Sequence, residues 1–354
     1  MVMRRRAFLS GAGAAGALAL AGCSEVVETR SLSGPPVLSN RPEAVYFPTH
    51  VEGMTMAGRA SAGEYAFALM YSYPHRFWTV TGSDVSKTPV GEDDDVHLMA
   101  TVWDPETGTV LPETGLDVEI SKGGELISQE VIYPMLSQPM GFHYGANFEL
   151  DGDGGYEVTV SVGGMSTRRT GSFRGRFGDP ASATIGFDYS RAARDGIAFE
   201  ETPDRAGDPA AREPMETGMP NSVLPPADEL PGEPRGMTTT GDAVLAVTTL
   251  EEPPAGVDAP DGAAYLAVSA RTPYNRMVLP AMAVEATLTA DGTLFDGELT
   301  RTLDSDLGYH YGAAVDAAPA GADLELRVPT PPQVARHEGY ETAFVGTAPT
   351  ELTL

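Results

Sequence analysis

Histidine and methionine side chains recur in the N-terminal half of the chain at spacings that suit a metal site. They are His50, Met54, Met56, His97, Met99, Met135, Met140 and His143. His97 and Met99 are two residues apart in a stretch expected to be a strand, so both side chains point to one face. Met135 and Met140 are expected in a loop directly before His143. Three segments can therefore bring thioether and imidazole groups together.

These ligand types indicate which metals the site would hold. Thioethers and imidazoles suit Cu(I), accept Cu(II), and bind Fe(II) when a carboxylate or a water joins them. The only cysteine is Cys23, close to the N-terminus, so no thiolate site is expected in the rest of the chain. For each residue alone, a structural interpretation stays open beside this one. Methionine commonly fills irregular gaps in a core, and a single histidine in a strand is commonly hydrogen-bonded.

Signatures of covalent or nucleotide chemistry are missing from the sequence. There is no Gly-x-Ser-x-Gly elbow, no HExxH, no P-loop and no GxGxxG at a strand-to-helix turn. Carboxylate pairs are frequent, but in so acidic a chain they carry little information. We therefore expect a binding protein and not an enzyme.

The charge of the chain is strongly negative. It has 50 Asp plus Glu against 23 Lys plus Arg, a net charge of −27, and its only lysines are Lys87 and Lys122. Abundant acid with almost no lysine is typical of proteins from extreme halophiles, where salt screens the repulsion between hydrated carboxylates. Because no basic patch is visible, nucleic-acid binding is excluded.

The N-terminal segment predicts export and lipid attachment. Arg4–Arg6 stand before Phe8 and Leu9, as in a twin-arginine signal, and a short run of small apolar residues follows. Leu20-Ala21-Gly22-Cys23 has the order of a lipobox. We expect residues 1–23 to be a signal with Cys23 as the lipidation site, and residues 24–40 to be a tether. The protein is then extracytoplasmic and lipid-anchored to the cell membrane.

The remaining sequence predicts an all-β fold. Short β-rich stretches such as Tyr65–Tyr73, Val96–Trp103, Leu116–Ile120 and Tyr156–Val162 alternate with Gly- and Asp-rich turns. Residues 41–190 and 237–354 are each expected to form an Ig-like antiparallel β-sandwich. Residues 191–236, rich in Pro, Gly, Asp and Glu, are interpreted as a linker.

Three short motifs occur in both regions, which indicates a tandem repeat. Gly53–Gly58 (GMTMAG) echoes Gly236–Gly241 (GMTTTG). Val-Leu-Pro at 110–112 returns at 278–280, and His-Tyr-Gly-Ala at 143–146 returns at 310–313. The last two pairs are offset by 168 and 167 residues, so one register with a single deletion joins them.

The second copy lacks most of the candidate ligands. It has Tyr265 at the position of His97, Ala267 at that of Met99 and Leu307 at that of Met140, and only His310 is retained. The position of Met135 falls on Thr302 or Leu303. Losing a histidine and an aligned methionine together favours the interpretation that one copy has lost a ligand set.

Part of the first region resembles a known family. Asp95–Ala100 (DVHLMA), Tyr133–Leu136 (YPML) and Gly141–Asn147 (GFHYGAN) resemble motifs of the periplasmic iron-transport proteins. These are copper-binding, Ig-like sandwich proteins encoded beside an iron permease. The resemblance covers Asp95–Val162 well and the second region weakly.

The resemblance implies a ligand set. The copper ligands of the family fall on His97, Met135 and His143, while Met99 and Met140 stand where the family has Glu and Asp. These exchanges of hard for soft ligands favour copper over Fe(II). The family's later histidine, after a Pro-Pro segment and an Arg, is matched only by His337. We hypothesise that the tandem pair imitates the family's homodimer and that His337 completes or borders the site.

The leading hypothesis is a lipid-anchored metal-binding protein that holds copper or iron and assists iron uptake through a membrane permease. The alternative is an Ig-like cell-surface interaction or envelope lipoprotein without a metal. His75 is interpreted as a structural loop or edge residue, and a ligand role for His50, Met54 and Met56 stays open. The sequence leaves open which metal binds, and whether the chain forms a homodimer or an intramolecular pseudo-dimer.

Overall fold

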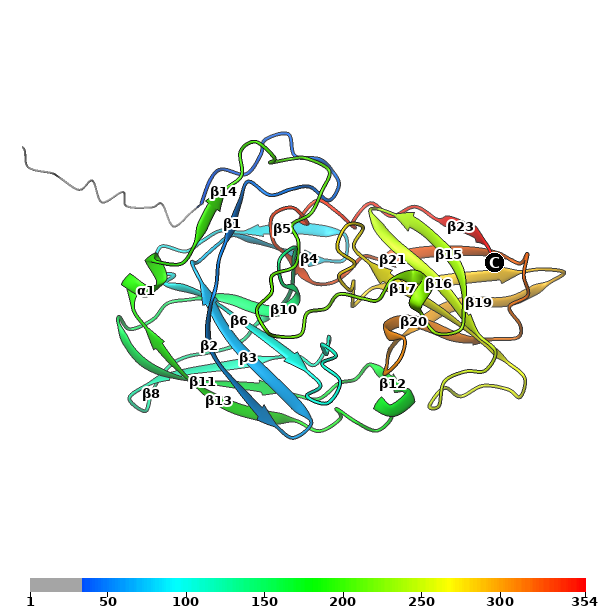
Figure 1. The fold of residues 1–354 in the computed structure, drawn as a ribbon, viewed down its shortest axis with the longest axis horizontal. Coiled ribbons are helices and arrows are strands. Elements are labelled where there is room, and N and C mark those ends of the chain that lie inside the picture. The colour runs from blue at the N-terminus through cyan, green and yellow to red at the C-terminus, as the bar shows by residue number, and fades with distance from the viewer. Residues whose placement is uncertain (1–33) are drawn as a thin grey trace, which may run out of the picture. The chain divides into compact units, whose positions relative to one another are not determined.

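A computed structural model describes residues 34–354, and in this part the protein is all-β, as predicted (Figure 1). The only helices described are α1 (Arg191–Asp195) and the short 3-10 turns η1 (Gly171–Phe173) and η2 (Ala227–Glu229). None of the described helices is long and apolar enough to span a bilayer. The predicted signal, Cys23 and the start of the tether lie outside the described residues.

The first half of the chain forms two sheets. The larger sheet has eight strands, paired in the order β2 (Thr55–Ala62), β3 (Tyr65–Ser72), β6 (Val96–Trp103), β10 (Gly141–Phe148), β9 (Tyr133–Ser137), β22 (Ala335–Arg336), β4 (Phe77–Thr81) and β5 (Asp84–Thr88). The smaller sheet has four, in the order β13 (Ala181–Tyr189), β11 (Gly154–Val162), β7 (Asp117–Lys122) and β8 (Glu125–Val131). Apolar side chains from both sheets form one buried cluster.

Alternation along the strands divides the larger sheet into two faces. In β6, Leu98 and Ala100 belong to the buried core cluster, as do Phe142 and Tyr144 in β10. The residues between them point to the opposite face, because successive side chains of a strand alternate. That outer face carries His97, Met99, His143 and Gly145, together with Met135 of β9, the register partner of His143.

The second half repeats the same pairing order. Its strands are β15 (Glu233–Thr240), β16 (Ala243–Leu250), β17 (Ala264–Arg271), β20 (Gly308–Val315), β19 (Thr293–Asp304), β18 (Ala283–Thr289), β21 (Asp323–Thr330) and β23 (Thr350–Thr353). The long β19 pairs with β18 through its first part and with β20 through its last. It therefore takes the places of both β8 and β9. The short β12 (Arg168–Thr170) adds to β19 in parallel.

One strand of the larger sheet comes from near the C-terminus. β22 pairs in parallel with β9, matching Ala335 to Met135, and antiparallel with β4, matching Arg336 to Trp78. The backbone N–H of the next residue, His337, donates to the Leu136 carbonyl at 3.1 Å. The C-terminal region thus completes a sheet of the first half and places His337 at its outer face.

The segment 191–236, interpreted above as a linker, carries structure of its own. It contains α1, η2, the start of β15 and β14 (Phe199–Glu201). β14 pairs antiparallel with β1 (His50–Glu52), with His50 opposite Glu201. The linker interpretation therefore describes only the stretches between these elements.

Strand pairing corrects two details of the sequence analysis. Gly58 and Gly236, not Gly53 and Gly236, hold matching places, because each follows a register shift in the first hairpin of its half. The alignment of GMTMAG with GMTTTG is therefore wrong, because it is displaced by five residues from the structural one. The expectation of a loop at Met135 is also wrong, since it lies within β9. Pairing with His310 gives Thr302 as its counterpart.

Candidate metal centre

Four histidine rings gather at the outer face of the larger sheet. His97 comes from β6, His143 from β10, His75 from the segment before β4, and His337 from directly after β22. The ring centroids of His97 and His75 are 3.9 Å apart, and those of His337 and His143 are 5.2 Å apart. His75, His97 and His337 each offer a nitrogen within 4.8 Å of the other two.

Hydrogen bonds to the Nδ1 atoms fix three of these rings. His143 Nδ1 lies 3.0 Å from the Gly141 carbonyl, and His75 Nδ1 lies 3.0 Å from the Tyr73 carbonyl. His97 Nδ1 lies 2.7 Å from Asn147 Oδ1, which also accepts from the backbone N–H of His75. Since each partner is an acceptor, Nδ1 carries the proton and Nε2 keeps its lone pair.

The four Nε2 atoms are the unusual feature of the cluster. In the part of the chain that the structure describes, those of His75, His97, His143 and His337 are buried and have no hydrogen-bond partner. Buried polar atoms are normally satisfied, and an exception indicates a bound ligand or a functional role. Nδ1–H anchored to an oxygen with Nε2 free is also the usual state of a metal-ligating histidine.

Burial keeps three of these rings, those of His97, His143 and His337, neutral. It lowers the pKa of His143 to about 4 and holds the pKa values of His97 and His337 well below their ordinary range. Neighbouring histidines add to the effect by electrostatic repulsion. Neutral imidazole is the form that binds a metal, so the cluster is prepared for a cation.

Met135 adds a soft ligand beside the histidines. A Cβ placed on Gly145 would come within 2.8 Å of His97 Nε2 and 3.1 Å of Met135 Sδ. Both atoms therefore lie over the same glycine, and the missing side chain at Gly145 leaves them room. The thioether and the imidazole nitrogens together make a mixed set that suits copper.

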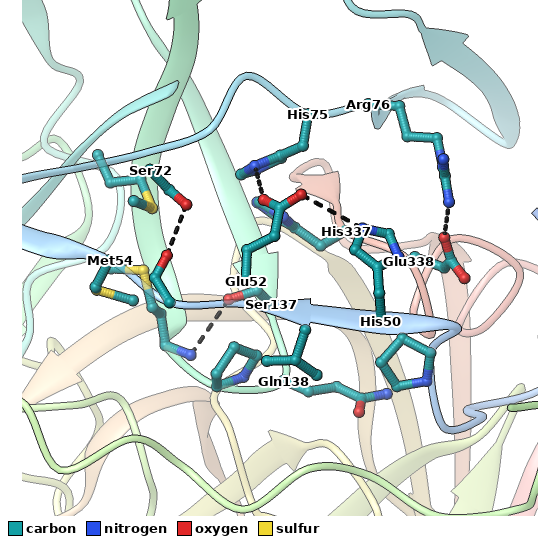
Figure 2. Close-up of a pocket in the computed structure, with 16 residues that line it drawn as sticks. His50, Glu52, Met54, Ser72, His75, Arg76, Ser137, Gln138, His337 and Glu338 are labelled. Carbon is teal, nitrogen blue, oxygen red and sulfur yellow. Dashed lines mark hydrogen bonds and ion pairs between the residues drawn. The ribbon is translucent and has the colours of Figure 1, made fainter. Parts of the chain in front are cut away.

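A carboxylate stands behind His75. Glu52 of β1 lies 2.6 Å from His75 Nδ1 and 3.4 Å from His50 Nε2 (Figure 2). Burial opposes its ionisation, but the interactions with His75 and His50 outweigh burial and lower the Glu52 pKa to about 2. An anion that orients a ligating histidine also raises the basicity of its free nitrogen.

The structure separates two of the predicted ligands from the others. Met99 packs in a cluster with Ala68 and Met70, which Met140 also contacts, whereas Met135 packs with Phe77 and Ala335. Met99 and Met140 thus belong to a neighbouring group of methionines. His97, Met135, His143 and His337 are brought together, and His75 joins them.

The second half shows the same motif histidine with its nitrogen satisfied. His310 Nε2 lies 2.9 Å from the hydroxyl of Tyr265, the residue that replaces His97. Arg168 donates to that hydroxyl at 2.9 Å and to Thr302 Oγ1 at 2.9 Å. A cationic guanidinium and a phenol therefore occupy the space where the first half has free ligands.

Sequence reasoning missed three residues of the centre. His75 was interpreted as structural, and neither Glu52 nor Asn147 was considered. The signal for Asn147 was present in the HYGAN motif, where Asn147 stands opposite His97 in the register. His75 and Glu52 have no local signal, because loop and strand packing alone bring them to the sheet.

Fold and site together define an all-β sandwich protein with a buried histidine–methionine cluster. Residues 228–353 match the model of a domain of unknown function (DUF7350). No curated protein matches the chain. Solved structures similar to it include FetP, as isolated, from a uropathogenic Escherichia coli strain, at 21% identity and a TM-score of 0.29, covering 40% of this chain and 96% of that one. A copper-bound FetP variant is 21% identical with a TM-score of 0.30, and the match covers 38% of this chain and 92% of that one. These values describe a distant likeness.

Proposed function

We propose that this protein binds one copper ion at His75, His97, His143 and His337, with Met135 as a further soft ligand. The observation that carries the proposal is the group of four buried Nε2 atoms without hydrogen-bond partners. A cluster that served only packing would leave four polar atoms unsatisfied, at a cost of about 1–3 kcal/mol each. A bound metal satisfies them together.

The ligand chemistry favours copper over ferrous iron. Fe(II) sites commonly include a carboxylate, and Glu52, a carboxylate beside the cluster, is engaged with the Nδ1 side of His75. A thioether with neutral imidazoles suits Cu(I) and accepts Cu(II). The function is coordination and hand-over of the ion, not covalent catalysis.

The proposal is tested by titrating the purified chain with Cu(II), Cu(I) and Fe(II) in high salt. Cu(II) binding near one equivalent is expected, and His97→Ala/His143→Ala should abolish it. His310→Ala is the matched control, because His310 belongs to the same HYGA motif, is equally buried and has a partner for Nε2. Its Cu(II) binding should equal that of the unchanged chain.

Two outcomes would overturn the copper site. The first is that the unchanged chain binds Cu(II) no more strongly than the His97→Ala/His143→Ala variant. In that case the alternative function, an envelope interaction protein, is the better account. The other is equal loss in the His310→Ala control, which would trace the effect to folding and not to ligation.

We further propose that the protein works outside the cytoplasm as a lipid-anchored partner of a membrane iron permease. Support comes from the twin-arginine and lipobox patterns before Cys23 and from the motif resemblance described above. Cys23→Ser should move the protein from the membrane fraction to the soluble fraction. Deleting the protein should lower cellular iron uptake, and uptake unchanged under iron limitation would contradict the role.

A further inference from the structure

Six methionines gather beside the histidine cluster without belonging to it. Met70 and Met99 are buried, and partly buried methionines pack around them, namely Met54, Met56, Met140 and Met219. They are six of the 14 methionines in the chain. We call this group the methionine cluster.

Three of its members form a row across the sheet. Met56 of β2 stands opposite Met70 of β3, and Met70 stands opposite Met99 of β6. Directly opposed residues on one face have Cβ atoms about 4.5–5.5 Å apart, and methionine has three rotatable bonds. Their sulfurs can therefore converge on one point above the sheet.

The row continues toward the histidines. The next register partner of Met99 is Gly145, the glycine over which His97 and Met135 lie. A line of soft ligands thus runs from the sheet edge at β2 to the candidate copper centre.

The second half indicates that the row is not a requirement of the fold. Pairing places Pro234, Thr248 and Ala267 where the first half has Met56, Met70 and Met99. Thr248 donates its hydroxyl to the Pro231 carbonyl at 2.7 Å. Since the same sheet positions accept a proline, a threonine and an alanine, three methionines there are a property of the first half alone.

One cavity joins the two groups. It has a volume of about 90 Å³, and its lining includes His75 and His337 as well as Met54, Met99 and Met140. Figure 2 shows Met54 on the left of this cavity and His337 on the right. Residues of both clusters therefore face the same cavity.

We propose that the methionine cluster is a second metal site, specific for Cu(I), with Met56, Met70 and Met99 as its thioether ligands. Neutral thioethers are soft ligands that favour Cu(I) over Cu(II) and over iron. The site accepts Cu(I) without a redox step and stands next to the histidine centre, to which the ion passes through the shared cavity. It does not depend on the histidine centre binding a metal.

The test is anaerobic Cu(I) titration of the full chain against a competing chromophoric chelator. The unchanged chain is expected to bind two Cu(I). Met70→Leu/Met99→Leu should bind one Cu(I) and still bind Cu(II) as before, because leucine keeps the volume and removes the sulfur. Met277→Leu/Met282→Leu, which alters two buried methionines of the second half, should bind two.

The histidine variant separates this site from the proposed function. His97→Ala/His143→Ala should lose Cu(II) binding but keep one Cu(I), whose X-ray absorption spectrum shows sulfur neighbours and no imidazole. The second site is overturned if Met70→Leu/Met99→Leu binds as much Cu(I) as the unchanged chain, or if the Cu(I) kept by the histidine variant has nitrogen neighbours. If the unchanged chain binds no Cu(II) but binds Cu(I) through the methionines, the proposed histidine centre is overturned and the methionine site stands.

Discussion

Two histidines of one motif differ in what faces their Nε2 atoms. His143 Nε2 is buried without a hydrogen-bond partner, whereas His310 Nε2 meets the Tyr265 hydroxyl. Both rings hold their Nδ1 on a carbonyl two residues earlier, at 3.0 Å. The motif therefore sets the orientation of the ring, and the neighbouring strand decides whether the ring is free to bind.

Substitution of Gly145 tests whether the space next to His97 and Met135 is needed for copper binding. Gly145→Ala places a methyl group 2.8 Å from His97 Nε2 and 3.1 Å from Met135 Sδ, so we expect copper affinity to fall by at least tenfold while the fold is kept. Gly186→Ala on β13 is the control, since nothing lies within 4 Å of its added Cβ. Isothermal titration of both variants measures the difference. Equal copper affinity in the Gly145→Ala and Gly186→Ala variants would show that the metal does not bind next to Gly145.

His310 predicts an acid-sensitive stability. Burial lowers its pKa to about 4, against about 6.5 in an unfolded chain. Below pH 6.5 His310 is protonated in the unfolded state but stays neutral in the folded state. Its contribution to the free energy of unfolding is therefore fully present above pH 6.5 and is lost as the pH falls toward 4. The loss reaches about 3 kcal/mol.

The comparison of the unchanged chain with His310→Gln isolates this group. We expect the free energy of unfolding, measured with denaturant at pH 7 and pH 4.5, to fall less in the variant than in the unchanged chain. Parallel losses in both proteins would show that other groups carry the acid response.

At the scale of elements, the insertion of β22 holds the centre together. Glu338, next to His337, forms a buried ion pair with Arg76, next to His75. It also accepts from the backbone N–H of Thr49 at 2.9 Å and from the Thr49 hydroxyl at 2.6 Å. One carboxylate thus ties the C-terminal segment to the start of β4 and to the segment before β1.

Removing that carboxylate should loosen the site. Glu338→Ala breaks a buried ion pair, which typically costs about 3–5 kcal/mol, and we expect weaker copper binding as His337 loses its support. Denaturant midpoints and copper titration measure the two effects. Glu325→Ala removes the anion of the exposed Arg327 pair and should change neither. A stable Glu338→Ala protein would contradict the role of the pair.

How far the sequence predicts this arrangement differs between elements. The all-β class follows from alternation and turn residues, and Val96–Trp103 has the predicted bounds. The approach of His337 to His97 and His143 was hypothesised only through the resemblance. The sequence predicts only a structural role for His75 and none for Glu52, because their positions depend on β22 and β1, which pair with segments far away in the sequence. Such long-range contacts have no local pattern.

At the scale of the whole molecule, the charge of −27 predicts a stability that rises with salt. Repulsion between carboxylates is screened over about 10 Å at 0.1 M salt and about 3 Å at 1 M. We therefore expect the melting temperature to increase between 0.1 and 2 M KCl. Replacing the exposed Glu119, Glu125 and Glu130 by Gln should reduce the increase. A melting temperature independent of salt would contradict the halophilic interpretation.

The C-terminal segment adds a strand to the larger sheet, and this affects how the proposed copper centre is occupied by metal at low protein concentration. A centre that borrows a ligand from a second molecule weakens on dilution, because the partner must first be found. Here His337 is covalently joined to the strands that it meets, so its effective concentration at the centre is set by the chain and not by how many copies are present. A single isolated molecule carries every ligand of the proposed copper centre, and its metal affinity should stay constant however sparsely the protein is distributed.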